Sequence, residues 1–184
     1  MSVHRGTTFL TSLALLAVLT ACAAPGPAQP DEPPAFVLTS PDIDADGYLP
    51  DSARGNVEEY CGDGDNVSPT FEWTGVPDGT KSYLLTMTDP NYPSYIHWVV
   101  TGIPGETTEL AAAPDGQLSV GVVGTNSRGE GDYVGPCQVD NGYLYTLYAL
   151  DEVIEGTPTT TLTQAVSLIA DHVLGQASVE AMRH

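Results

Sequence analysis

The chain has 184 residues, of which twenty-four are acidic and five are basic, so its formal net charge at neutral pH is −19. Such a surface repels phosphate backbones, and this excludes nucleic acid as a partner. It also repels anionic lipid headgroups, so charge alone cannot hold the protein at a membrane.

The first 21 residues are typical of a bacterial lipoprotein signal peptide. A basic start, His4-Arg5, precedes an apolar run from Phe9 to Val18 and then Leu19-Thr20-Ala21-Cys22. The run is about ten residues long, whereas a membrane span needs ~20. The four residues ending at Cys22 resemble the lipobox, in which the cysteine is acylated after cleavage. We expect lipidation of Cys22 and anchoring to a membrane of the cell envelope, outside the cytoplasm. The alternative is an ordinary secretory signal with a cysteine there by chance.

Residues 22–35 are expected to form a proline-rich tether. Residues 23–35 hold five prolines, one glycine and no aromatic side chain, so they cannot bury a core. Thirteen residues of such chain reach about 40 Å. The remaining residues, 36–184, are long enough for one domain with its own core.

The domain is predicted to be mainly β. Short runs rich in Val, Ile, Tyr, Trp and Thr recur between turn residues, at Phe36–Thr39, Thr70–Trp73, Tyr83–Thr88, Ile96–Ile103, Leu118–Val123 and Tyr143–Leu150. Helical spacing of apolar residues occurs late in the chain, at Leu162, Ala165, Val166, Ile169 and Val173. Thr161 and Gln164 have capping-box spacing at its start, and Gly175 can end it. This order favours an antiparallel β-sandwich with a C-terminal α-helix.

Two cysteines remain for the folded domain if Cys22 carries lipid. Cys61 and Cys137 are then an even pair in an oxidising compartment, which favours a disulfide. That bridge would close a loop of about 77 residues and contribute roughly 4–5 kcal/mol in the chain-entropy model. Two separate thiols and a metal-binding role are the alternatives. Zinc would need more ligands than Cys61, Cys137 and His97 supply.

The segment between two predicted strands carries an acid and a histidine at its ends. Prolines 90 and 93 exclude a central strand here, so Asp89–Ser94 should form a stiff loop. The loop would bring Asp89 close to His97, and the carboxylate would then raise the histidine pKa. Ser94 lies in the same loop, so a serine hydrolase is an alternative. However, a nucleophile, its base and an orienting acid rarely fit on one short loop. We therefore expect no enzyme.

The chain resembles the phosphatidylethanolamine-binding protein family, in its bacterial branch that is called Raf kinase inhibitor-like. The resemblance runs from about residue 36 to residue 178. It rests on motifs that occur in one order: Asn66-Val67-Ser68-Pro69, Phe71-Glu72-Trp73, Asp89-Pro90, Pro93-Ser94, His97-Trp98, Ile103-Pro104, Gly135-Pro136-Cys137 and Tyr143–Leu150.

The resemblance implies a Greek-key β-sandwich with a small pocket at one end that binds phosphate-like or carboxylate groups. Asp89 and His97 match the acid and the histidine of that pocket. Gly135 and Pro136 match the loop on its rim, and Tyr143 matches a pocket tyrosine. An imidazolium, loop N–H groups and a phenol are donors that can hold an oxyanion.

Two positions depart from the family pattern. Asn91 stands where a second acid is usual, and Asn141 stands where a histidine is usual. Asparagine can donate through its amide but cannot be cationic, so anion binding should be weaker than is usual in the family. The loop after Cys137 also lacks the usual prolines.

The expected function is therefore non-catalytic binding of a small anionic ligand or a phospholipid headgroup, with no cofactor and no metal. The predicted ligand-binding residues are Asp89, His97, Gly135, Pro136, Asn141 and Tyr143. The alternative is a protein partner, because family members resemble inhibitors, and an envelope or secreted protease is accessible to an exported domain.

Overall fold

The computed structural model describes residues 34–57, 61–62 and 64–184. The predicted signal peptide, the lipidation site Cys22 and all but the last two residues of the predicted tether lie outside these residues. Within the described residues, no helix has the length and apolar character that crossing a membrane requires.

The described residues are mainly β, as predicted. The strands are β1 (Val37–Thr39), β2 (Val67–Ser68), β3 (Phe71–Thr74), β4 (Ser82–Thr88), β5 (Ile96–Pro104), β6 (Glu109–Leu110), β7 (Ala113–Pro114), β8 (Val122–Val123), β9 (Gly142–Leu150) and β10 (Val173–Met182). The helices are a short 3₁₀ turn, η1 (Asp51–Ala53), and α1 (Leu162–Ile169).

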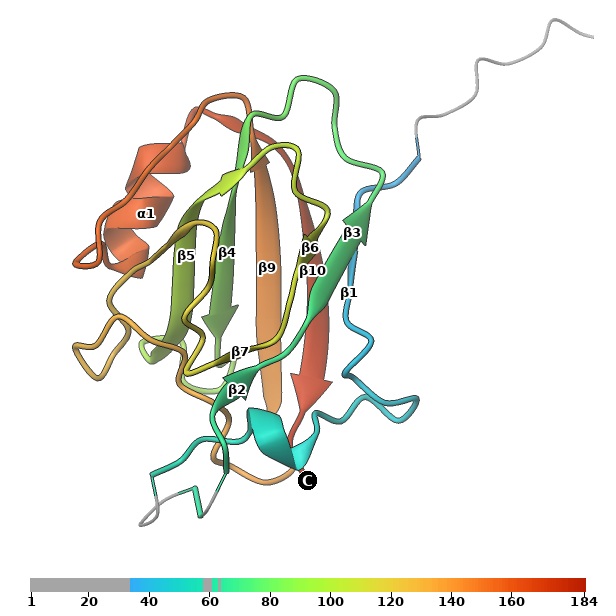
Figure 1. The fold of residues 1–184 in the computed structure, drawn as a ribbon, viewed down its shortest axis with the longest axis vertical. Helices are drawn as coiled ribbons and strands as arrows, with labels where there is room; N and C mark the ends of the chain where they lie inside the picture. The colour runs from blue at the N-terminus through green and yellow to red at the C-terminus, as the bar shows by residue number, and fades with distance from the viewer. Residues whose placement is uncertain (1–33, 58–60, 63) are drawn as a thin grey trace, which may run out of the picture. The chain divides into compact units, whose positions relative to one another are not determined.

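Two antiparallel sheets form the sandwich. The larger sheet has the order β10-β9-β4-β5-β8, and the smaller has the order β1-β3-β6. Figure 1 shows β1, β3 and β6 lying across one face of the long strands, while α1 lies beside β5. A separate pair, β2 and β7, closes the lower end of the molecule in that view.

The central strand β4 is buried on both faces, and its apolar residues accordingly point to both of them. Tyr83, Leu85 and Met87 enter the main core between the sheets. Leu84 points to the opposite face and packs in a second cluster with residues of α1. The three long predicted strands at the centre of this sheet are confirmed to within one residue at each end.

The end of the chain differs from the prediction. The capping box of Thr161 and Gln164 starts α1 as expected, but the helix ends at Ile169. Val173, predicted to continue the helix, begins β10, and Gly175 lies at an irregularity in the pairing of β10 with β9. The inward residues of β10 include Ala177 and Ala181, whose small side chains give little strand signal in the sequence.

The predicted strand at Leu118–Val123 was also mostly wrong, because pairing is limited to Val122–Val123. Gly121, just before this short strand, has a φ of 78°. A positive φ interrupts a regular strand, so the pairing cannot extend back through this residue.

Candidate functional site

Asp89 follows the end of β4 and organises the loop to β5. Its Oδ1 atom accepts hydrogen bonds from the backbone N–H groups of Asn91 (2.8 Å) and Tyr92 (3.2 Å). The side chain is only 3% exposed. A buried carboxylate is tolerated where such hydrogen bonds replace those to water. Asp89 therefore has a structural role, which is to stabilise this turn.

The two positions that depart from the family pattern contact each other. Asn141 donates from Nδ2 to Asp89 Oδ2 (2.8 Å), and its Oδ1 accepts a hydrogen bond from Asn91 Nδ2. An amide pair thus occupies the place where the resemblance implies an acid and a histidine. One amide donates and the other accepts, and neither side chain carries a formal charge. Asn141 is therefore tied to Asp89 and is not among the residues that line the cavity described below.

His97, at the start of β5, is held by a backbone carbonyl. Its Nδ1 lies 2.7 Å from Val134 O, and since a carbonyl can only accept, Nδ1 carries a proton. In the neutral ring Nε2 is then an acceptor, and in the charged ring it is a second donor. The ring meets Tyr143 edge to face, with the centroids 5.1 Å apart.

The expectation that Asp89 raises the pKa of His97 was wrong in its net direction. Burial lowers the pKa of His97, and this effect exceeds the opposing effects of the Val134 carbonyl and of Asp89. The imidazole is 5% exposed, so the charged form loses most of its hydration. We infer that His97 is neutral at pH 7 in the free protein.

Tyr143, in β9, has a hydroxyl group that is arranged to donate. Its oxygen accepts hydrogen bonds from the backbone N–H groups of Cys137 (3.3 Å) and Gln138 (3.1 Å). Two bonds to the oxygen leave the hydroxyl proton for a further partner.

The backbone of Gly135 and Pro136, two predicted ligand-binding residues, has no free N–H group to offer a ligand. The Gly135 N–H donates to Asn66 Oδ1 (2.8 Å), and proline has no N–H. A Cβ at position 135 would collide with backbone atoms of Ala53 and Gly55. Glycine is required here by close packing of two backbone segments, and neither residue is among those that line the cavity.

Asn66 is the residue that joins these segments. It is 1% exposed and donates from Nδ2 to Tyr133 O (2.7 Å) and Asp115 Oδ1 (3.1 Å), in addition to accepting the Gly135 bond. Its φ of 54° is in the left-handed region, which asparagine tolerates better than most residues. Sequence reasoning singled out its motif but did not identify this role.

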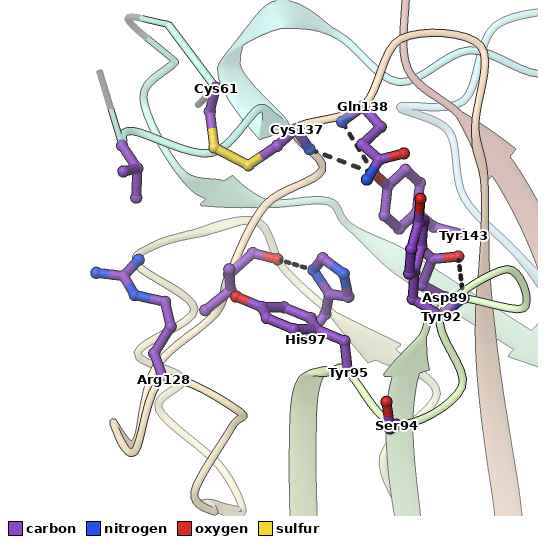
Figure 2. A pocket seen from close by; sticks show the side chains of 12 residues that line it. Cys61, Asp89, Tyr92, Ser94, Tyr95, His97, Arg128, Cys137, Gln138 and Tyr143 are labelled. Carbon is purple, nitrogen blue, oxygen red and sulfur yellow. Dashed lines mark hydrogen bonds between the residues drawn. A yellow bond between two sulfur atoms is a disulfide. The ribbon is translucent and has the colours of Figure 1, made fainter. Parts of the chain in front are cut away.

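A cavity of about 470 Å³ lies against His97 and Tyr143 (Figure 2). It is lined by Val57, Cys61, Asp89, Tyr92, Ser94, Tyr95, His97, Arg128, Val134, Cys137, Gln138 and Tyr143. Cys61 and Cys137 form a disulfide in its wall, the pairing favoured by the cysteine count. Asp89, His97 and Tyr143 are thus the predicted ligand-binding residues that reach the cavity.

Arg128 and Tyr95 are cavity residues that sequence reasoning missed. Arg128 pairs with Glu130 through an Nη2–Oε2 distance of 3.1 Å. Its turn is fixed to β5, because the Ser127 N–H donates to Ile96 O (3.0 Å) and the Ile96 N–H donates to Ser127 Oγ (2.7 Å). Ile96 directly precedes His97, so the turn that carries Arg128 is held beside the histidine. The scarcity of basic residues was the one sequence signal that could have drawn attention to Arg128.

Residues of the described part of the chain form no group of three or more His, Cys, Asp or Glu side chains suited to a metal ion.

Comparison with known proteins gives a consistent set of relatives. The sequence profile named phosphatidylethanolamine-binding protein matches residues 39–184. A UPF0098 protein of Methanothermobacter thermautotrophicus is 39% identical over 134 residues, covering 68% of this chain and 89% of the relative. A protein of Mycobacterium tuberculosis named "Putative lipoprotein LppC" is 32% identical over an alignment of 197 residues, covering 96% of this chain and 94% of the relative.

A solved structure with the same fold points to the same family. The crystal structure of Escherichia coli YbcL, described as a new member of the mammalian PEBP family, matches with a TM-score of 0.72 at 25% identity. The match covers 81% of this chain and 98% of YbcL.

We predict that the two buried or half-buried histidines titrate on opposite sides of the ordinary value of about 6.5. Burial lowers the pKa of His97, whereas the hydrogen bond that His172 donates to Asp151 raises the pKa of His172. NMR of the ring protons across a pH series measures both in one sample, with His172 as the internal control. A His97 that gains its proton at a higher pH than His172 would contradict this account.

We also predict that Gly135→Ala lowers the free energy of unfolding by roughly 1–3 kcal/mol or more, because the added Cβ meets fixed backbone atoms. Gly131→Ala is the matched control, since the nearest atom to a Cβ there is 3.5 Å away. Its effect should stay within about 0.5 kcal/mol. Urea unfolding measures both variants, and equal stabilities would show that position 135 is not tightly packed.

Proposed function

Because this chain belongs to the phosphatidylethanolamine-binding protein family, we propose that it is a non-catalytic protein whose cavity binds a small anion. The ligand group would be a phosphate or a carboxylate, including one carried by a phospholipid headgroup. The observation that carries this proposal is the pair of adjacent donors in the cavity wall. Tyr143 has a hydroxyl proton left for a partner, and His97 gains a second donor when it is protonated.

The proposal includes uptake of a proton on binding. A bound anion favours the imidazolium form and raises the pKa of His97 from its lowered value in the free protein. The complex therefore holds more protons than the free protein between the two pKa values. By linkage, the affinity rises as the pH falls through this interval and levels off below the pKa of free His97.

The hydrogen bonds of the site support binding over hydrolysis. In a serine nucleophile system, the acid orients the histidine, and the histidine accepts the serine proton. Here His97 Nδ1 is bonded to the Val134 carbonyl, and the Asp89 carboxylate is bonded to loop N–H groups and to Asn141. Asp89 and His97 are thus bonded to different groups, whereas a serine hydrolase needs its acid bonded to its histidine.

We further propose that the protein is anchored in the cell envelope through a lipid on Cys22. The predicted signal peptide and tether support this location, and so does the relative from M. tuberculosis that is named a lipoprotein. The alignment with that relative covers nearly all of this chain.

We expect inorganic phosphate, titrated over the millimolar range, to shift the ring resonances of His97. Tyr143→Phe should weaken binding about ten-fold or more, since it removes a hydrogen bond to a charged group. Tyr148→Phe is the matched control, because Tyr148 lies in the same strand but packs in the cluster beside α1.

The linked proton is measured with sulfate, whose charge is constant near neutral pH. Sulfate affinity should rise as the pH falls toward the lowered pKa of free His97, and this dependence should be lost in His97→Asn. His97 resonances that stay fixed throughout both titrations would remove the basis for the proposed function.

Replacement of Cys22 tests the anchor. Cys22→Ser is expected to release the protein from the membrane fraction, because the acyl chains lose their attachment site. Intact-mass analysis should find lipid on the wild type and on a Cys61→Ser, Cys137→Ser control, which retains Cys22. A Cys22→Ser protein that remains in the membrane fraction would exclude this mode of anchoring.

A further inference from the structure

The cavity is much larger than the group that its two donors can hold. Its volume of about 470 Å³ is within the range of sites for drug-sized organic molecules. His97 and Tyr143 meet edge to face and together occupy one region of the wall. A phosphate or carboxylate bound to both would leave most of the cavity to the rest of the ligand.

The remaining wall is largely apolar. Val57, Val134 and the disulfide of Cys61 and Cys137 line it, and the aromatic ring of Tyr95 lies beside His97 with the ring centroids 4.9 Å apart. Figure 2 shows Tyr95 and His97 together in the cavity wall, with the disulfide above them. The body of a ligand whose acid group is bound at His97 would therefore meet an aromatic ring and aliphatic side chains.

The backbone that carries this apolar wall is held in place by hydrogen bonds and the disulfide. The Tyr95 N–H donates to Tyr92 O (2.7 Å), and the next residue, Ile96, is bonded on both its N–H and its C=O to Ser127. On the other side the disulfide fixes Cys137, whose N–H is bonded to Tyr143. A preformed wall loses little conformational entropy on binding, so contact with an apolar body adds directly to affinity.

Arg128 adds a charge preference at this wall. It is the basic residue that lines the cavity, in a chain with twenty-four acids. Figure 2 shows it on the side of His97 that lies away from Tyr143. Its pairing with Glu130 leaves the guanidinium partly exposed. The cation offsets the repulsion that an acidic surface exerts on an entering anion.

From this division of the cavity, we infer that the ligand is an organic anion with a compact aromatic or branched apolar body, such as an aryl phosphate or an aryl carboxylate. The acid group binds at His97 and Tyr143, and the body packs on Tyr95, Val134 and the disulfide. This inference rests on the proposed function and names its ligand class.

A matched set of probes separates the acid group from the body. Calorimetric titration of the full chain compares methyl phosphate, phenyl phosphate and phenol. Methyl and phenyl phosphate share the acid group, so their ratio reports the apolar wall. Phenyl phosphate should bind at least about ten-fold more tightly than methyl phosphate. Phenol, which lacks the acid group, should bind more weakly than phenyl phosphate by a similar factor or more.

Variants at Tyr95 locate the gain. In Tyr95→Ser the advantage of phenyl over methyl phosphate should fall several-fold, whereas Tyr95→Phe, which keeps the ring, should retain it. Phenyl phosphate that binds no more tightly than methyl phosphate to the wild type would overturn the inference and leave the anion site intact. Phenol that binds as tightly as phenyl phosphate, or no binding of either phosphate, would instead overturn the proposed function.

Discussion

The cavity depends on one buried amide. Asn66 bonds the Tyr133 carbonyl and the Gly135 N–H, on either side of Val134. The Val134 carbonyl in turn holds His97, and the segment continues to the disulfide and to the N–H groups that bond Tyr143. Because buried polar groups are costly to leave unpaired, this chain of bonds specifies one arrangement of the segment. Asn66, which does not line the cavity, therefore helps to position the two candidate ligand donors, His97 and Tyr143.

The sequence predicted the fold well where burial produces a long and unambiguous pattern. Strands β4, β5 and β9 are seven to nine residues long and rich in aliphatic, aromatic and β-branched side chains, and their ends were predicted to within one residue. The pattern failed where packing uses small residues or short pairs. β10 turns Ala177 and Ala181 inward, and the helical spacing that precedes it ran on into its first residue. The edge strand β8 has only two residues, too few to show the alternation of apolar and polar residues that identifies a strand.

The site was predictable in its location but not in its electrostatics. Asp89, His97 and Tyr143 do line one cavity, and the resemblance identified them. The partners of each group were not readable, because they depend on backbone atoms brought together by folding. Asp89 is bonded to its own loop and to Asn141, and the burial of the imidazole outweighs the effect of the Asp89 charge on the pKa of His97. Gly135 has a packing role that its motif concealed, and Tyr95 and Arg128 carried no motif at all.

The chain enters the sandwich at the end opposite to the cavity. Phe36 packs on Tyr83 at the beginning of β4, with ring centroids 6.5 Å apart, and Asp89 follows the last residue of the same strand. In Figure 1 β4 runs from the end where β1 begins toward the loop to β5. Seven extended residues, about 20 Å, separate the two ends. A reporter group attached at Pro34 or Ala35, both exposed, would therefore stand about one strand length from the loop that carries Asp89, clear of the candidate ligand donors.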